Sequence, residues 1–428
     1  MTTVKVITLG CSKNTVDTEH LLADLPSDAF TLLPEDSGEY ADFLLINTCG
    51  FIGDAKEQSI EVILEAVEAK KRGEIGKLAV FGCLSQRYAQ DLPEEIPEVD
   101  AWFGARDIRP ITEYLGARPG KGTSRYCTAP GKPYAYIKIS EGCDRRCSYC
   151  AIPYIRGAHK SVPMEDILEE ARNLAAAGAR ELIVIAQDTT YYGLDLYGRR
   201  ALAELLRKLS QVDGIEWIRI HYSYPDGFPE DVLEEMASNP KICSYLDIPL
   251  QHISDKVLSN MHRHVTSAWT RELIGRMREK IPGVVLRTTM IVGHPGEGEE
   301  EFDELLSFVR EARFERLGAF TYSEEDGTWG AQNLLDDVSE GEKQDRMNRL
   351  MSLQSSISLA FNRSRVGKTE KVLVDDCVDG TLVCRSQYES PEVDGEILVK
   401  GSAPIGSFIN VRILACDEYD LIGEIVTV

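Results

Sequence analysis

Long apolar stretches are missing from this 428-residue sequence, and their absence bears on whether the chain spans a membrane. No run of about 18 apolar residues occurs, so we expect no membrane-spanning helix. The first residues, MTTVKVITLGC, lack the basic segment and apolar core of a secretory signal and are typical of a strand. We therefore expect a cytoplasmic protein. In a reducing cytosol, its eleven cysteines are better explained as metal ligands or catalytic thiols than as disulfides.

Positive charge is also scarce. The chain has 47 lysine and arginine residues against 70 aspartate and glutamate residues, which gives a formal net charge of −23. Such a surface repels nucleic acid unless a local basic patch overrides it, and it attracts a basic partner. The alternative is that the acidity only keeps the protein soluble.

The first 118 residues alternate between strand and helix patterns. These patterns follow one another at 3–9 (strand), 14–24 (helix), 42–48 (strand), 55–71 (helix) and 78–82 (strand, again followed by helix). Apolar, β-branched strands that alternate with helices predict an open α/β domain with a parallel sheet. The following segment, 119–133, is rich in glycine, proline and charge and is predicted as a linker.

Residues 134–364 continue the alternation, with a polar helix at about 339–364. The predicted strands are 135–140, 181–186, 216–222, 245–249, 284–292 and 315–322. Six strand–helix units are fewer than the eight that close a barrel. The sequence therefore predicts a partial, open (β/α)6 barrel.

The tail, residues 365–428, changes character. Short β-like runs with turn signals between them predict a small, five-stranded, OB-like barrel. Within residues 366–428 there are five basic residues against twelve acidic ones, whereas an RNA-binding barrel should have the opposite balance. We therefore expect the tail to favour a basic protein partner over RNA. The alternative is that its charge is incidental.

Three cysteines each end a predicted strand of the first domain: Cys11, Cys49 and Cys83, here called the strand-end cysteines. The carboxyl ends of parallel strands line one edge of an open sheet, so these thiols are predicted to converge although they are far apart in sequence. A three-cysteine cluster is the favoured interpretation. The alternative is three small, buried hydrophobic side chains.

Three other cysteines, Cys143, Cys147 and Cys150, follow the first strand of the middle region with C-x3-C-x2-C spacing and are here called the loop cysteines. Close thiolates suit a soft metal centre. Structural zinc and ordinary ferredoxin clusters need four ligands, and the nearest candidate, His159, is nine residues beyond Cys150. A [4Fe–4S] cluster on three cysteines leaves one iron open for another ligand. Structural zinc, an ordinary ferredoxin cluster and chance grouping are the alternatives.

The C-x3-C-x2-C spacing, with Tyr149 before the last cysteine, resembles the radical S-adenosylmethionine (SAM) superfamily. The whole chain resembles the methylthiotransferase family of that superfamily. This resemblance is carried by LGCSKNTVDTE (9–19), INTCGFI (46–52), FGC (81–83), EGCDRRCSYCAIP (141–153), DIPLQH (247–252) and IVGHPGE (291–297). It implies an N-terminal methylthiotransferase domain at 1–118, a radical SAM core at 134–364 and a TRAM domain at 365–428.

The resemblance also implies two [4Fe–4S] clusters and SAM as cofactors. The strand-end cysteines would hold an auxiliary cluster that carries a sulfur atom, and the loop cysteines would hold the cluster that cleaves SAM. One SAM molecule would methylate the sulfur and a second would supply the radical. An external sulfur donor and an external electron donor are implied, and no side chain is expected to act as a catalytic acid or base.

Two branches of the family differ in substrate. One modifies the β-carbon of an aspartate in ribosomal protein S12 of the small subunit, and the other modifies an adenosine in tRNA. Three short sequences favour the ribosomal-protein branch: SKN after Cys11, GFI after Cys49, and DRRCSYCAIP. Either the free protein or the assembled small subunit could be the form that is modified.

Polar residues at or near the ends of the predicted core strands are candidates for the SAM or substrate pocket. They are Tyr149, Gln187, Asp188, Arg219, His221, Gln251, Arg287 and Thr289. The alternative is that they form structural hydrogen bonds at strand ends. Outside this enzyme class, an iron–sulfur electron carrier or a zinc-dependent binding protein would also use clustered cysteines, but a carrier gains nothing from an open iron.

Overall fold

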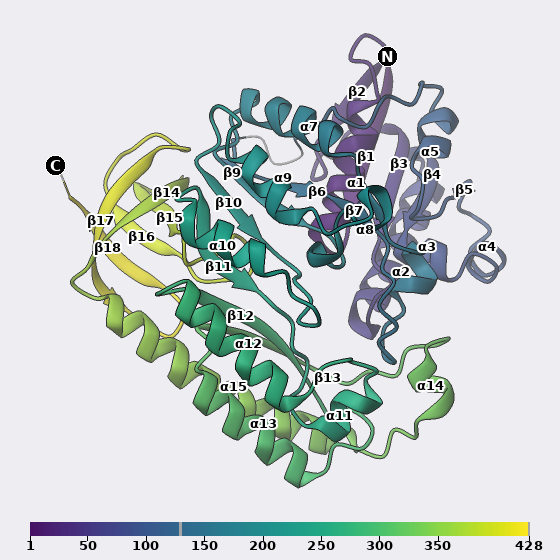
Figure 1. Cartoon of the computed structure of the whole chain (residues 1–428). Coiled ribbons are helices and arrows are strands. Elements are labelled where there is room, and N and C mark those ends of the chain that lie inside the picture. The colour runs from purple at the N-terminus through teal and green to yellow at the C-terminus, as the bar shows by residue number, and fades with distance from the viewer. Residues whose placement is uncertain (128–130, 427–428) are drawn as a thin grey trace. The chain divides into compact units, whose positions relative to one another are not determined.

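The structure, a computed structural model, describes residues 1–127 and 131–426 and divides into two compact units (Figure 1). The first unit comprises the described residues of Met1–Pro130 together with Ser140–Arg145 and Cys150–Asn173. The second comprises Gly131–Ile139, Arg146–Tyr149 and the described residues of Leu174–Val428. Residues 128–130 of the predicted linker and 427–428 of the predicted barrel lie outside the described residues.

A five-stranded, wholly parallel sheet organises the first unit, with strand order β2-β1-β3-β4-β5. Its strands are β1 (Thr2–Thr8), β2 (Phe30–Leu33), β3 (Ala41–Thr48), β4 (Ile75–Gly82) and β5 (Ala101–Trp102). The predicted open α/β sheet is therefore confirmed. The edge strands β2 and β5 escaped prediction because four and two residues are too few to show a periodic pattern.

Both faces of this sheet are buried. Its helices are α1 (Ser12–Ala23), α2 (Gly53–Lys71), α3 (Cys83–Arg87), α4 (Leu92–Glu95) and α5 (Arg109–Tyr114), and α6 (Ile152–Arg156) also belongs to this unit. Leu44 and Ile46 of β3 pack with α2 on one face, whereas Leu45 packs with α1 and α5 on the other. This alternation follows the two-residue period of a strand. A small antiparallel pair, β7 (Ser140–Glu141) and β8 (Lys160–Ser161), completes the unit.

The second unit contains a six-stranded parallel sheet with order β13-β12-β11-β10-β9-β6. Its strands are β6 (Tyr134–Lys138), β9 (Glu181–Ile185), β10 (Trp217–Ile220), β11 (Ile242–Asp247), β12 (Val285–Val292) and β13 (Arg316–Thr321). Neighbours in space are neighbours in sequence, and β6 and β13 do not pair. The open, partial barrel is thus confirmed.

Helices connect these strands in the second unit (Figure 1). They are η1 (Thr189–Tyr191), α8 (Leu194–Tyr197), α9 (Leu202–Leu209), α10 (Glu230–Ser238), α11 (Asp255–Asn260), α12 (Ser267–Lys280), α13 (Glu299–Ala312) and α14 (Trp329–Asn333), while α7 (Met164–Ala176) has residues in both units. The long α15 (Glu340–Arg365) follows and leads into the C-terminal strands. None of the described helices is long and apolar enough to cross a bilayer.

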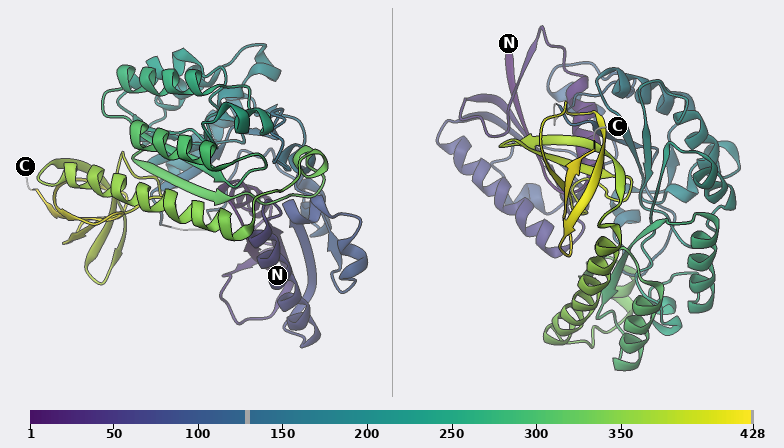
Figure 2. Two further views of the ribbon diagram at one scale, coloured as in Figure 1. Left: turned by 90° about the horizontal axis from the view of Figure 1, so that it is seen from below. Right: turned by 90° about the vertical axis from the view of Figure 1, so that its left-hand side faces the viewer.

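The C-terminal strands close into a barrel of order β14-β15-β16-β18-β17, which stands beyond the end of α15 (Figure 2). Its strands are β14 (Thr369–Val378), β15 (Thr381–Ser386), β16 (Ile397–Lys400), β17 (Phe408–Cys416) and β18 (Leu421–Ile425). Alternate side chains such as Val372, Val374, Leu382 and Cys384 fill its core. The predicted five-stranded barrel is confirmed.

Residues 387–396 join β15 to β16 and are here called the barrel loop. This loop lies against the six-stranded sheet and accepts hydrogen bonds from side chains of β6, β10, β11 and β13. Glu392 accepts hydrogen bonds from Tyr134 and Tyr136 of β6 at 3.1 and 2.9 Å. Asp394 accepts one from the buried Tyr245 of β11 at 2.7 Å. The barrel is therefore built into the core rather than attached by a flexible tether.

Buried ion pairs strengthen this junction. Glu181, fully buried at the start of β9, pairs with Arg219 at 2.7 Å and with Arg385 of the barrel at 2.8 Å. In the barrel loop, burial alone would raise the pKa of Glu389, but the charges of Arg365 and Arg316 outweigh it and lower that pKa to about 2. A buried carboxylate is tolerated only with such partners, because an unpaired one would be costly to desolvate.

Candidate iron–sulfur and cofactor sites

The strand-end cysteines occupy equivalent places at one edge of the first sheet. Cys49 directly follows β3, Cys83 directly follows β4, and Cys11 is the N-cap residue of α1 after β1. Because β1, β3 and β4 are parallel neighbours, all three cysteines lie at the carboxyl edge. Cys11 is exposed, Cys49 is half-buried and Cys83 is buried.

Two glycines allow these cysteine segments to approach each other closely. A Cβ atom on Gly10, whose φ is +95°, would lie 2.8 Å from Cys49 Cβ and 3.0 Å from its Sγ. A Cβ atom on Gly50 would lie 2.6 Å from the backbone nitrogen of Leu84. A side chain would not fit at either position, so the two glycines allow the Cys11, Cys49 and Cys83 segments to lie close together.

Asn14, in the first turn of α1, holds the same segments by hydrogen bonds. Its Nδ2 atom donates to the carbonyl oxygen of Leu9 at 2.8 Å and to that of Thr48 at 3.1 Å. These carbonyls directly precede the Gly10–Cys11 and Cys49 positions. Asn14 therefore fixes the relative position of two of the three cysteine loops, a role that its place in SKN did not reveal.

Electrostatics support the convergence of the three thiols. Burial raises the pKa of Cys83 to about 11, the nearby Arg156 opposes that rise, and the charges of Cys11 and Cys49 add to it. Burial likewise raises the pKa of Cys49, with Cys11 contributing. The pKa of Cys83 thus responds to both other cysteines and that of Cys49 to Cys11, which requires that the three lie near one another.

The chemistry of the strand-end donor set fits an iron–sulfur cluster. Within the described residues, no group of three or more histidine, cysteine, aspartate or glutamate side chains is arranged to hold one metal ion. A cluster binds each thiolate through a different iron, so its ligands stand further apart than those of one ion. Three converging thiols suit a soft centre of that kind.

The loop cysteines lie in a segment without helix or strand, and all three are half-buried. In the first unit, Cys143 donates its backbone N–H to Gly157 at 3.0 Å. In the second unit, Ser148 donates its own to Met261 at 3.0 Å, and Cys147 Sγ lies 3.8 Å from the Tyr224 hydroxyl oxygen. The loop therefore makes hydrogen bonds within each unit, and its three thiols are all partly accessible.

Among the predicted pocket residues, Gln251 has the clearest features of a binding position. Its backbone has φ +71°, unusual for a residue with a side chain, and it pairs with Thr289 and Ile291 of β12. Its buried Oε1 atom has no hydrogen-bond partner among the described residues. Strain and an unsatisfied amide at the carboxyl end of a sheet are typical of a ligand site.

Other predicted pocket residues have structural partners. Asp188 accepts from the backbone and hydroxyl of Thr190 and caps η1. Arg219 donates to Glu181 and to the carbonyl of Gln387 in the barrel loop. These contacts match the alternative that such polar residues form structural hydrogen bonds at strand ends. A role in cofactor binding remains a prediction for both residues.

The remaining pocket candidates lie on or beside core strands. Arg287 Nη1 donates to Asp247 at 2.9 Å, and Thr289 accepts the backbone bond from Gln251. Tyr149 accepts from Arg263 at 3.2 Å, His221 Nε2 lies 2.8 Å from Ser390 Oγ, and the half-buried Gln187 follows β9. Their contacts with SAM also remain predictions.

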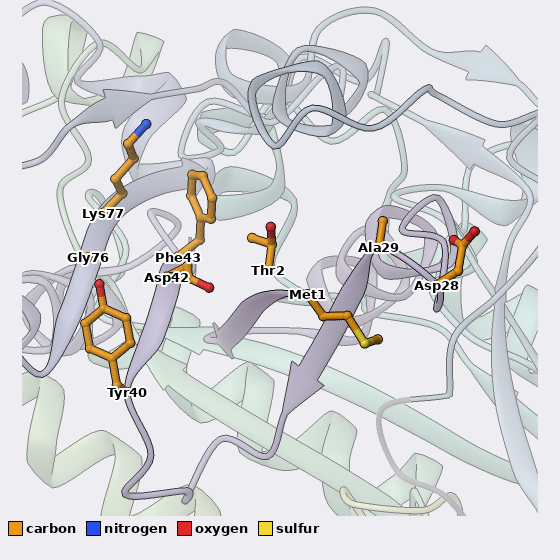
Figure 3. Close-up of a pocket in the computed structure, with 9 residues that line it drawn as sticks. All are labelled: Met1, Thr2, Asp28, Ala29, Tyr40, Asp42, Phe43, Gly76 and Lys77. Carbon is orange, nitrogen blue, oxygen red and sulfur yellow. The ribbon is translucent and has the colours of Figure 1, made fainter.

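A polar depression in the first unit lies at the opposite edge of its sheet (Figure 3). Thr2, Asp42 and Gly76, which line it, lie at the amino ends of β1, β3 and β4. It is therefore separate from the strand-end cysteines and contributes nothing to their site.

Three family models match successive parts of the chain. They are an uncharacterized protein family, UPF0004, over residues 3–104, the radical SAM superfamily over residues 137–309 and the TRAM domain over residues 366–426.

Two solved structures share the fold. The radical SAM methyltransferase TsrM from Kitasatospora setae has a TM-score of 0.57 at 14% identity, over 94% of this chain and 83% of that one. The cobalamin-dependent radical enzyme OxsB has a TM-score of 0.56 at 12% identity, over 83% of this chain and 58% of that one.

Relatives of much higher identity extend over the whole chain. One from Porphyromonas gingivalis, named ribosomal protein uS12 methylthiotransferase RimO, is 50% identical over 99% of both chains. Another of that name, from Parabacteroides distasonis, is 48% identical over 99% of this chain and 98% of its own. The model matched over residues 137–309 is that of the radical SAM superfamily, and the fold agrees with it. The chain belongs to the RimO family of methylthiotransferases, whose cofactors are SAM and [4Fe–4S] clusters.

Proposed function

We propose that this enzyme transfers a methylthio group to the β-carbon of an aspartate in ribosomal protein S12, called uS12 in the names of its relatives. The names of relatives 47–50% identical over nearly the whole chain support this substrate. The structural observation that carries the proposal is the meeting of the strand-end cysteines at one sheet edge, because a second cluster distinguishes sulfur insertion from simpler radical chemistry.

The six cysteines are the proposed cluster ligands. The strand-end cysteines would hold the auxiliary cluster, and the loop cysteines would hold the cluster that binds SAM. When bound, these groups supply a transferable sulfur and the radical that removes hydrogen from an unactivated C–H bond. The chain's own residues supply position and shielding.

Within the second unit, residues of the core sheet would orient SAM. Gln251 offers a buried amide oxygen that needs a donor, such as the amino group of SAM. Arg287, held by Asp247, offers guanidinium N–H groups to a carboxylate. Tyr149 and Gln187 lie at the neighbouring loop and strand end and are proposed to line the same pocket.

The barrel supports a protein substrate over tRNA. The five basic and twelve acidic residues of 366–428 would repel a phosphate backbone and attract a basic ribosomal protein. We therefore propose no direct RNA binding by the barrel, a cytoplasmic location beside ribosomes, and external electron and sulfur donors. We also propose three functional domains at 1–118, 134–364 and 365–428, a division supported by the three separate main sheets.

A paired assay tests the substrate. The reconstituted enzyme, SAM and a reductant are incubated anaerobically with uS12 or the small subunit, and separately with adenosine-rich tRNA. We expect a mass gain of one methylthio group on a single aspartate of uS12 and none on tRNA. Modification of tRNA alone would show that the substrate is wrong.

A further inference from the structure

Arg156, the last residue of α6, is only 4% exposed and lies beside a strand-end cysteine. Its Nε atom donates to Cys83 Sγ at 3.3 Å. Ile155, the residue before it, packs in the same small core as Cys83. Arg156 follows Cys150 by six residues, so the segment after the loop cysteines reaches the strand-end cysteines within the first unit.

The orientation of the Arg156 guanidinium is fixed on every side. Nη2 donates to Asn14 Oδ1 at 2.6 Å. Nη1 donates to Asp17 Oδ2 at 2.6 Å, Ala105 O at 3.2 Å and Glu141 Oε2 at 3.2 Å. A guanidinium is a rigid, planar fork, so these bonds hold it with the N–H on Nε directed at the thiol.

This contact has an electrostatic consequence for the sulfur. Cys83 lies in a buried setting that disfavours a thiolate, and Arg156 supplies both an N–H donor and a positive charge at that sulfur. The reduction potential of an iron–sulfur cluster depends on hydrogen bonds to its sulfurs and on nearby charge. Reduction adds an electron, so a positive group favours the reduced state.

We propose that Arg156 is a positioning residue of the strand-end cluster that fixes the Cys83 sulfur and raises the reduction potential of that cluster. This inference rests on the proposed function, because it requires that the strand-end cysteines bind a cluster. It assigns to the segment after the loop cysteines a second role, which is to control the electronic state of the sulfur-carrying site.

The test isolates the strand-end cluster in the full-length chain by replacing the three loop cysteines with alanine. This parent is compared with versions that also carry Arg156→Gln, which keeps an N–H donor without charge, or Arg156→Lys, which keeps the charge. Arg106→Met is the matched control, because Arg106 donates to Ile155 O at 2.8 Å and so supports α6 through the backbone rather than through a cysteine sulfur. Iron content and the midpoint potential, followed by EPR, are measured for each.

The parent should bind about four iron atoms per chain, and a parent without iron would refute the proposed function itself. Given a loaded parent, we expect Arg156→Gln to make the potential more negative, whereas Arg156→Lys and Arg106→Met should leave it near the parent value. An unchanged potential in Arg156→Gln, or an equal shift in Arg106→Met, would overturn the inference.

Loss of iron in Arg156→Gln would also be decisive. If Arg156→Lys then binds iron, the positive charge is what the site requires, as proposed. If both variants lose iron while Arg106→Met retains it, Arg156 supports the cluster only by its size and packing. The proposal that it sets the reduction potential of the cluster is then wrong.

Discussion

His221 Nε2 lies 2.8 Å from Ser390 Oγ, which joins the carboxyl end of a core strand to the barrel loop across 169 residues of sequence. Both side chains are buried. The C-terminal barrel therefore contacts the residues that line the predicted cofactor pocket, and changes in the barrel loop should alter more than substrate docking.

Asp394→Ala should affect both stability and SAM binding. The change leaves the buried Tyr245 hydroxyl without its acceptor, which we expect to lower the free energy of unfolding by about 1–3 kcal/mol. Arg287 Nε lies 3.9 Å from Asp394 Oδ1 and would lose that neighbour, so SAM should bind several-fold more weakly. Urea unfolding and equilibrium dialysis of the reconstituted enzyme measure the two effects.

Glu424→Ala is the control for that experiment. It removes an exposed barrel carboxylate whose pair with Arg412 should contribute only about 0–1 kcal/mol. Equal SAM affinity in Asp394→Ala and Glu424→Ala would mean that the barrel loop does not position Arg287.

Acid should loosen the junction of barrel and core through Glu389. Its pKa in the folded protein is about 2, below the ordinary value of 4.5, so its stabilising effect is complete above pH 4.5 and is lost as the pH falls toward 2. The expected loss is on the order of 3 kcal/mol. Hydrogen exchange of the barrel strands at several pH values measures it.

Glu389→Gln is the corresponding control. The amide does not titrate, so the variant should be less stable at pH 7 but should lose less additional stability between pH 4.5 and 2. If the stability of Glu389→Gln fell with pH as steeply as that of the parent, other carboxylates would be responsible for the acid sensitivity.

Gly50→Ala should prevent assembly of the strand-end cluster. The new Cβ would lie 2.6 Å from the Leu84 backbone, so the Cys49 and Cys83 segments must separate. Iron should fall from about eight to about four atoms per chain. Gly53→Ala is the matched control, because its Cβ meets nothing within 4 Å, and it should keep the full content.

Single cysteine changes should separate the two proposed clusters. Cys147→Ala should abolish formation of deoxyadenosine from SAM, whereas Cys49→Ala should keep that reaction and lose methylthio transfer. Chromatography of the nucleoside and mass spectrometry of uS12 measure the two activities. Cys377→Ala, at an exposed barrel position, should change neither. Deoxyadenosine formation by Cys147→Ala would refute the assignment of the loop cysteines.

Local patterns in the sequence determined the elements that the structure contains. The apolar run at 181–186 became β9, and the short runs of the tail became five barrel strands, because strand formation depends on side chains a few positions apart. The same reasoning located the strand-end cysteines, since each ends a parallel strand. It missed Asn14 and Arg156, whose type and spacing carry no local signal.

The sequence by itself determined the three main sheets and two cysteine groups, because periodicity, turn signals and spacing depend on residues that are close together in the chain. The strand order of the first sheet came only from the structure. Only the tertiary structure decided that Arg156 faces Cys83 across 73 residues and that Arg219 is occupied by Glu181 and the barrel loop. The physical reason is that a buried charge pairs with whichever groups the packed fold brings next to it. Those groups can be any number of residues away along the chain.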